Sequence, residues 1–257
     1  MKKTSIISLL YHEVTNNPED SGFQRKNALP YKHSVDEFRS HLSELNKFNK
    51  YVTTINNIHR GRKNILLTFD DGGISNLRIA DMLEEYNFKG HFFISTDFIG
   101  KPYFLNEDHL KDLFRRGHII GSHSQSHPNV FKSLTALKMK EEWNNSRNIL
   151  SSILKTDIDC CSIPGGDSSQ LCYKTASSSG YKFIFNSEPK VTIEENRELI
   201  VLGRISFKKD EPILKLKNTL QLKGLKKLLI IRKIKVLIKT IFFPIYSRVH
   251  NSRKHEE

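Results

Sequence analysis

Two adjacent carboxylates end a strand-like run of the sequence and suggest a metal centre. The apolar run 65–69 leads directly into Asp70 and Asp71, which two glycines follow. Placing two carboxylates together at the end of a buried strand is costly unless a cation joins them. If Asp71 binds a metal ion, Asp70 can stay ionised beside it and act as a base. The alternative, equally supported by these residues alone, is a helix start at which Asp caps free N–H groups.

A pair of histidines follows another strand-like run. His123 and His127 come directly after the run 118–122 and are four residues apart. If the intervening turn is helical, both imidazoles can converge on one ion. One carboxylate and two histidines, with positions left open for water, form a recurring catalytic metal set. The spacing alone is weak among 11 histidines, but its place at a strand end favours a metal site.

The third polar cluster is a glycine-rich turn. Pro164, Gly165 and Gly166 follow the strand-like run 159–163. Backbone N–H groups in such a turn can approach a ligand closely, although taken by itself the pattern indicates only a turn.

The elements that must position these clusters alternate along the chain. Apolar runs rich in β-formers occur at 5–10, 65–69, 91–95, 118–122, 159–163, 181–186 and 199–206, and helical periodicities lie between them. Strands that are apolar throughout, separated by helices, predict an α/β fold with a mostly parallel sheet, open or closed into a barrel. Chemistry then belongs at the carboxyl ends of the strands, where all three clusters fall.

The charge of the chain is concentrated at one end. The 257 residues include 41 Lys and Arg against 28 acidic residues, a net charge of +13. The segment 213–257 accounts for +10 of this, which leaves +3 for 1–212. We therefore expect a catalytic domain over 1–212 and a basic tail, interleaved with apolar residues, over 213–257. The tail has no nucleic-acid recognition motif, so nucleic acid is a disfavoured partner.

Two interpretations of the tail remain open. It can form an imperfect amphipathic helix on an anionic membrane surface, since each nearby Lys or Arg contributes about 1 kcal/mol there. It can also form a final helix that packs on the barrel with solvated lysines.

The cysteines and the amino terminus indicate the compartment. Three cysteines, two of them adjacent, make no disulfide framework and lack the paired spacing of a zinc site, so free thiols in a reducing compartment are expected. The apolar run 4–10 is short and lacks a cleavage site, and we interpret it as a first buried strand. We expect a cytoplasmic protein, held peripherally at the inner membrane face if the tail binds lipid, rather than a secreted one.

Together the clusters resemble the polysaccharide deacetylase family, the NodB-homology domain of carbohydrate esterase family 4. The resemblance covers roughly 5–207 and includes the segments 10–14, with the sequence LYHEV, and 89–94, with the sequence KGHFFI. It implies a distorted TIM-like (β/α) barrel with a divalent metal, commonly zinc. The implied roles are as follows: Asp70 is the catalytic base, Asp71, His123 and His127 are metal ligands, and Pro164 and Gly165 lie at the substrate and oxyanion site.

The sequence departs from the family in two places. An arginine usually stands two residues before the proline of the third motif, where this chain has Ser162. The last motif usually supplies a histidine as general acid, whereas the run 201–206 contains Arg204 and no histidine. Arginine cannot donate a proton at neutral pH because its pKa exceeds about 12. Arg204 and His12 are therefore accessory candidates, and the general acid is unassigned.

The resemblance implies a metal-dependent hydrolase that removes N-acetyl or O-acetyl groups from an amino-sugar oligosaccharide or polysaccharide. Two alternatives stay open. The first is an amidohydrolase that acts on a small non-sugar amide with the same ligands. The second is a non-catalytic carbohydrate-binding or biosynthetic partner with the same fold, which the two missing motif residues favour and the intact Asp70 opposes.

Overall fold

The structure is a computed structural model that describes residues 4–196 and 199–241. The strands are β1 (Ser5–Tyr11), β2 (Glu13–Val14), β3 (Lys32–His33), β4 (Lys63–Phe69), β5 (Gly90–Ile94), β6 (Ile119–Ser122), β7 (Cys160–Ser162), β8 (Phe183–Phe185), β9 (Glu194–Asn196), β10 (Leu199–Leu202) and β11 (Arg204–Ser206). The α-helices are α1 (Val35–Asn46), α2 (Asn76–Glu84), α3 (Glu107–Arg115), α4 (Ala136–Leu154), α5 (Gln170–Ser178), α6 (Ile213–Leu220) and α7 (Leu225–Ile241).

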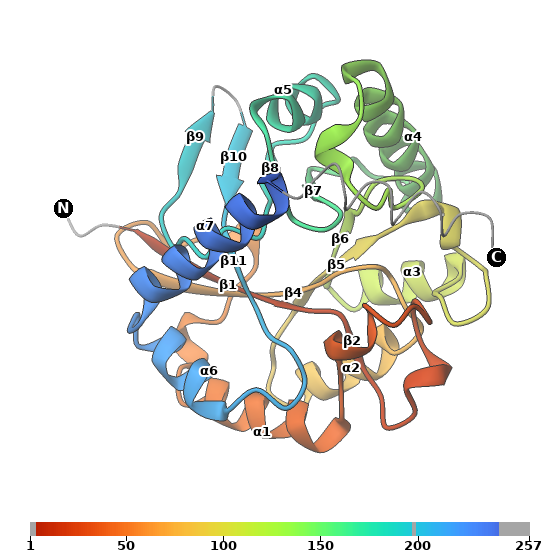
Figure 1. Cartoon of the computed structure of the whole chain (residues 1–257). Coiled ribbons are helices and arrows are strands. Elements are labelled where there is room, and N and C mark those ends of the chain that lie inside the picture. The colour runs from red at the N-terminus through yellow and green to blue at the C-terminus, as the bar shows by residue number, and fades with distance from the viewer. Residues whose placement is uncertain (1–3, 197–198, 242–257) are drawn as a thin grey trace.

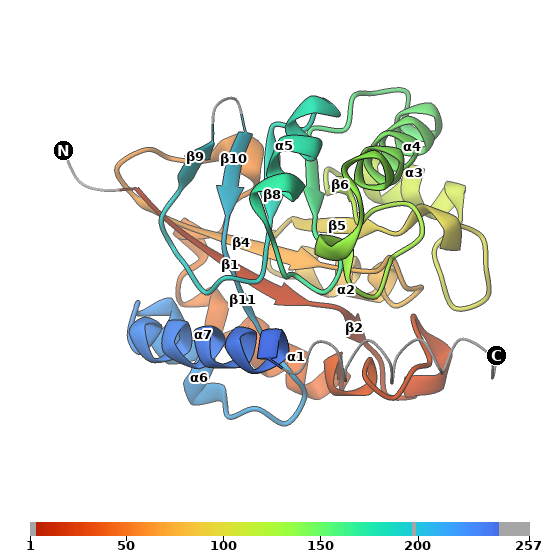
Figure 2. The same cartoon turned by 45° about the horizontal axis from the view of Figure 1, so that its top comes forward.

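A curled, mostly parallel sheet forms the centre of the molecule (Figures 1 and 2). Its order is β11-β1-β4-β5-β6-β7-β8-β10-β9, and β9 alone among these pairs antiparallel. The stretch predicted as one strand over 199–206 is interrupted at Gly203. Its first half, β10, pairs with β8, and its second half, β11, pairs with β1. This bent stretch nearly closes the sheet into a barrel, which confirms the predicted TIM-like architecture.

The strands are apolar throughout because both faces of the sheet are buried. In β4, Ile65 and Leu67 belong to the core between the sheet and the helices. Leu66, between them, points to the other face and packs in the barrel interior with Phe93 of β5 and Phe185 of β8. Side chains alternate across a strand, so this pattern places one apolar set inside the barrel and one under the helices.

The basic tail contributes to the same structure over its described part. Leu216 and Leu220 of α6 are fully buried in the main core, and Lys63 Nζ donates to the Leu220 carbonyl at 2.7 Å. Arg232 of α7 pairs with Asp167 in the glycine-rich loop after β7. Residues 213–241 thus lie against the barrel, and the rest of the predicted tail, 242–257, lies outside the described residues. Across 4–196 and 199–241, no helix has the length and apolar character needed to span a bilayer.

The bend at Gly203 gives a stability prediction. A Cβ there would lie 2.3 Å from the Glu188 carbonyl oxygen and 2.8 Å from that of Lys190, so backbone would have to move. We expect Gly203→Ala to lower the free energy of unfolding by about 3 kcal/mol, because overpacked sites rarely relax fully. Urea denaturation measures it. Gly100→Ala, whose Cβ would meet nothing within 4 Å, is the control, and its left-handed backbone predicts a cost of only about 1 kcal/mol. Equal losses in the two variants would contradict the packing argument.

Candidate metal centre and active site

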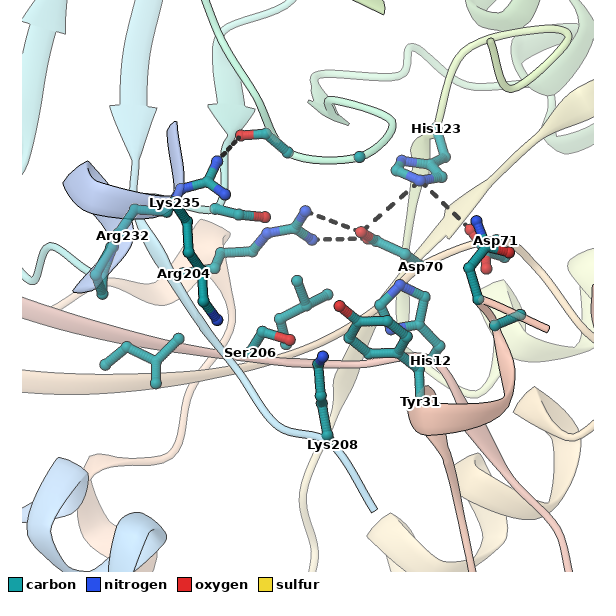
Figure 3. Close-up of a pocket in the computed structure, with 18 of the residues that line it drawn as sticks. His12, Tyr31, Asp70, Asp71, His123, Arg204, Ser206, Lys208, Arg232 and Lys235 are labelled. Atoms are coloured by element: carbon teal, nitrogen blue, oxygen red, sulfur yellow. Dashed lines mark hydrogen bonds and ion pairs between the residues drawn. The ribbon is translucent and has the colours of Figure 1, made fainter. Parts of the chain in front are cut away.

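Four strand ends converge at one edge of the barrel. Asp70 and Asp71 follow β4, His123 follows β6, Ser162 ends β7 and Arg204 begins β11. The parallel register brings these positions together, although the outermost are 134 residues apart in the sequence. Figure 3 shows the labelled side chains pointing toward one another across the pocket floor.

Asp71, His123 and His127 form a group that can hold a metal ion. Their ligand atoms all lie within 4.8 Å of one another. The Nε2 atom of His123 is 3.5 Å from Asp71 Oδ1, and the Nε2 atom of His127 is 3.3 Å from the same oxygen. The structure thus brings together the three residues to which the resemblance assigns the metal.

The two histidines converge through a turn that is not helical. Residues 123–127 are not helical, and the chain instead takes left-handed backbone at Ser124 (φ 65°) and His127 (φ 52°). Glu142 of α4 holds this turn, accepting hydrogen bonds from the Gln125 and Ser126 N–H groups at 2.9 and 2.8 Å. The two histidines therefore converge without the helical turn that their spacing suggested as one route.

Asp71 also has left-handed backbone, with φ at 80°. Such a conformation costs a non-glycine residue of order 1–3 kcal/mol and persists only where its surroundings enforce it. The neighbouring Glu13 carboxylate is part of those surroundings. It accepts a hydrogen bond from Ser75 Oγ at 2.5 Å and another from Ser21 Oγ, and burial raises the pKa of Glu13 to about 7. A Cβ at Gly73 would lie 2.0 Å from Glu13 Oε1, so any larger residue in this turn would have to displace the Glu13 carboxylate.

The hydrogen bonds around His123 determine which of its nitrogens is protonated. Ser162 Oγ donates to Asp70 Oδ1 at 3.0 Å, so its single proton is used there. The same Oγ lies 2.6 Å from His123 Nδ1 and must accept from it, and the Ser162 carbonyl is a second acceptor at 3.1 Å. Nδ1 therefore carries the proton, and Nε2 presents a lone pair toward the carboxylates, as metal-ligating histidines do.

This arrangement fits a bound cation. Burial is the largest influence on His123 and lowers its pKa to about 4, so the ring is neutral at pH 7. Its Nε2 lone pair then faces carboxylate oxygens of Asp71 at 3.5 Å and Asp70 at 3.8 Å with no proton between them. Acceptors opposed in this way repel unless a positive charge joins them. Two imidazoles and one carboxylate are, moreover, a donor set that zinc takes in catalytic sites.

Asp70 is held by a buried arginine. Arg204 Nη1 and Nη2 donate to Asp70 Oδ1 and Oδ2 at 2.7 and 2.8 Å, and Nε donates to the Asn186 carbonyl at 3.1 Å. Both side chains are almost fully buried. Burial raises the pKa of Asp70, but the nearby Arg204 and His123 outweigh it and hold the pKa below its usual range. Asp70 is therefore an ionised carboxylate beside the metal group.

Two departures from the family pattern occupy neighbouring places. Ser162, which stands where the family has arginine, bridges Asp70 and His123 by its hydroxyl. Arg204 comes from the late strand and supplies the cation at Asp70 instead. The bridging role of Ser162 was not expected from the sequence, because a serine before a Pro-Gly-Gly turn carries no signal for it.

A cavity of about 510 Å³ lies above the metal group, and all of the remaining candidates except Pro164 line it. Gly165 lines it with an exposed backbone at φ 68°, whereas Pro164 is buried and is not among the lining residues. His12 also lines it, with its ring centroid 4.6 Å from that of Tyr31, and Figure 3 shows these two rings next to each other. Burial, the largest influence, lowers the pKa of His12 despite the nearby Asp71 and Asp70.

Known proteins share both the sequence pattern and the fold. The family model for polysaccharide deacetylases matches residues 57–184. YxkH of Bacillus subtilis (strain 168) is 28% identical over 128 residues, 49% of this chain and 46% of that protein. The peptidoglycan-N-acetylmuramic acid deacetylase PdaA of the same strain is 27% identical over 176 residues, 67% of this chain and 62% of PdaA. This chain thus spans about half to three-fifths of the length of these relatives.

The solved structure of BC0361, a polysaccharide deacetylase from Bacillus cereus, superposes with a TM-score of 0.71 at 17% identity. The match covers 84% of this chain and 68% of that one, which shows the common barrel fold. The stretch matched by the family model contains both aspartates, both histidines and the glycine-rich turn. The chain belongs to the polysaccharide deacetylase family.

Proposed function

We propose that this protein is a zinc-dependent deacetylase that hydrolyses N-acetyl groups on an amino-sugar oligosaccharide or polysaccharide. The observation that carries the proposal is the convergence of Asp71, His123 and His127 beside the ionised Asp70, at the base of an open cavity. The first three residues would hold the ion, and Asp70 would stay free to accept a proton. A divalent cation at such ligands polarises an acyl carbonyl and lowers the pKa of water toward neutrality.

The chain's own groups account for the remaining chemistry. Asp70 accepts a proton from the attacking water, while Arg204 and Ser162 hold both of its oxygens in place. Gly165 lines the cavity, and its backbone N–H would donate to the oxyanion that develops on the substrate carbonyl. Removing one such donor typically costs on the order of 100-fold in rate.

His12 is the proposed donor of the proton that the leaving amine needs. The run 201–206 contains no histidine, and the histidines lining the cavity within the described residues are His12, His123 and His127. Since the last two are assigned to the ion, His12 remains. Its half-buried, neutral imidazole would take up the proton that Asp70 accepts from water and pass it to the amine, as a general acid–base group does.

Metal analysis coupled to acetate release tests the proposal. We expect the purified protein to contain about one equivalent of zinc and to release acetate from N-acetylglucosamine oligomers, as a single catalytic site requires. A chelator should abolish the release, and added zinc should restore it. His127→Ala should lose both metal and activity. His59→Ala, a substitution of an exposed histidine away from the cavity, should retain both.

The outcomes separate the rival functions. If the protein binds metal and hydrolyses small non-sugar amides but not the oligomers, the proposed sugar substrate is wrong and the proposed metal-dependent hydrolysis stands. Oligomer binding with no hydrolysis at any metal loading would indicate a non-catalytic carbohydrate-binding protein. Acetate release that is unaffected by the chelator would overturn the metal assignment.

A further inference from the structure

Helix α7 turns an aliphatic face toward solvent. At about 100° per residue, five of its side chains fall within an arc of about 120°. These are Ile230, Ile231, Ile234, Leu237 and Ile238, whose exposed fractions are 58, 39, 51, 59 and 51%. The half-buried side chains of the helix lie on the opposite side, toward the barrel: Leu225, Leu228, Leu229, Arg232 and Val236. The helix is therefore amphipathic in an unusual sense, with its outer face apolar.

The same helix is strongly cationic. Its sequence contains six Lys and Arg residues and no acidic residue. By the same helical geometry, Lys226 and Lys233 flank one edge of the aliphatic face and Lys235 flanks the other, while Lys227 lies on the face itself, one turn before Ile230 and Ile231. Arg232 instead turns inward, where it pairs with Asp167 and lies 3.5 Å from Glu188, and this holds the helix on the barrel. An aliphatic face edged by lysines is the pattern of helices that lie in the surface of an anionic bilayer.

Helix α7 also forms part of the cavity wall. Leu228, Ile231, Arg232 and Lys235 line the cavity, and Figure 3 shows Lys235 extending from the helix toward Arg204. Ile231 borders both the cavity and the aliphatic face. Any surface that covers this face therefore lies at the mouth of the cavity.

We propose that α7 docks on an anionic lipid bilayer through its aliphatic face and lysine edges, and that this places the cavity mouth at the membrane surface. Resting on the proposed function, the substrate is then an acetylated amino sugar carried by a membrane lipid. The charge of α7 favours a bilayer over a second copy of the chain, because a second copy would bring together two helices that carry five lysines each. An anionic bilayer supplies both the apolar interior and the opposite charge.

Vesicle flotation with a matched pair of variants tests the docking. The variant Ile234→Ser with Leu237→Ser removes two exposed side chains of the face that do not line the cavity. The control Leu137→Ser with Leu214→Ser removes two aliphatics that are 67 and 59% exposed on α4 and α6. We expect the unaltered protein and the control to bind phosphatidylglycerol vesicles and to bind phosphatidylcholine vesicles weakly. The α7 variant should bind phosphatidylglycerol vesicles at least about 10-fold less, because binding scales with buried apolar area.

A separate measurement tests whether the substrate is carried by a membrane lipid. All three proteins should release acetate from soluble N-acetylglucosamine oligomers at the same rate. Only the α7 variant should be slower on an N-acetylglucosaminyl glycolipid embedded in phosphatidylglycerol vesicles. Equal glycolipid rates for all three would overturn the lipid-carried substrate.

Other outcomes overturn the docking. Vesicle binding that is the same in the α7 variant and the unaltered protein, or absent from both, would do so. A dimer that dissociates in the α7 variant, seen by sedimentation velocity, would make the face a contact between copies. Failure of the proposed function has a different signature: no acetate from the soluble oligomers of the zinc-loaded protein, while vesicle binding persists.

Discussion

Asp70→Asn should reduce acetate release by at least about 100-fold while leaving the bound zinc in place. A general base contributes typically 100- to 10,000-fold, and an amide cannot accept the proton of the attacking water. The proposed metal ligands, Asp71, His123 and His127, are unchanged by the substitution. Steady-state assays of acetate release, together with metal analysis of the same sample, measure both effects.

The Asp70 variant needs a control for folding, because it leaves Arg204 as a buried charge with no carboxylate partner. Breaking a buried pair from one side is destabilising, whereas removing both charges is often nearly neutral. We therefore expect Asp70→Asn combined with Arg204→Met to regain most of the lost stability and none of the activity. Full activity in Asp70→Asn, or recovery of activity in the double variant, would show that Asp70 is not the base.

The strands and the edge that carries the site could be predicted from the sequence. Runs such as 65–69 are apolar throughout because one face packs inside the barrel and the other under helices. Such strands must be parallel and covered on both sides, so polar residues at their carboxyl ends gather at one edge. Asp70, Asp71 and His123 follow this rule, and it locates them without a structure.

Backbone conformation at the site could not be predicted. The four-residue spacing of the histidines fits a helical turn, yet Ser124 and His127 are left-handed and Glu142 of α4 stabilises the turn. Side-chain type does not encode this, because left-handed backbone in non-glycine residues is imposed by tertiary contacts. Tertiary contacts also explain the bend at Gly203, because carbonyl groups of a loop some 15 residues earlier lie where a Cβ would be.

The partner of Asp70 was likewise hidden. Arg204 lies 134 residues further along the chain and reaches Asp70 only because β11 pairs with β1, which pairs with β4. Sequence reasoning singled out Arg204 as a substitute for a missing residue without identifying what it contacts. A long-range pair between strands that are not consecutive can be predicted only when the order of the strands in the sheet is known.

Arg204→Met should lower the free energy of unfolding by about 3–5 kcal/mol at neutral pH, the cost of leaving a buried carboxylate unpaired. In the unaltered protein the folded-state pKa of Asp70 is depressed, chiefly because Arg204 outweighs the effect of burial. The pair therefore adds stability above the unfolded pKa, and that stability is lost as the pH falls through the folded pKa. Without Arg204, burial prevails and raises the pKa of Asp70. The contribution of Asp70 to the pH dependence of stability therefore changes sign. The variant should recover relative stability as the pH is lowered toward about 4 and Asp70 takes up a proton.

The raised pKa of Asp70 in Arg204→Met should also change the pH dependence of catalysis. Because the base must be ionised, raising the pKa of Asp70 moves the acid limb of the pH–rate profile to higher pH. A general loss of folded protein would lower the rate at every pH without moving that limb. Arg204→Lys is the conservative control: it keeps the charge but cannot make two parallel N–H bonds to the carboxylate, so its limb should shift less. If Arg204→Met is slower by a constant factor across the pH range, Arg204 supports the fold and does not set the basicity of Asp70.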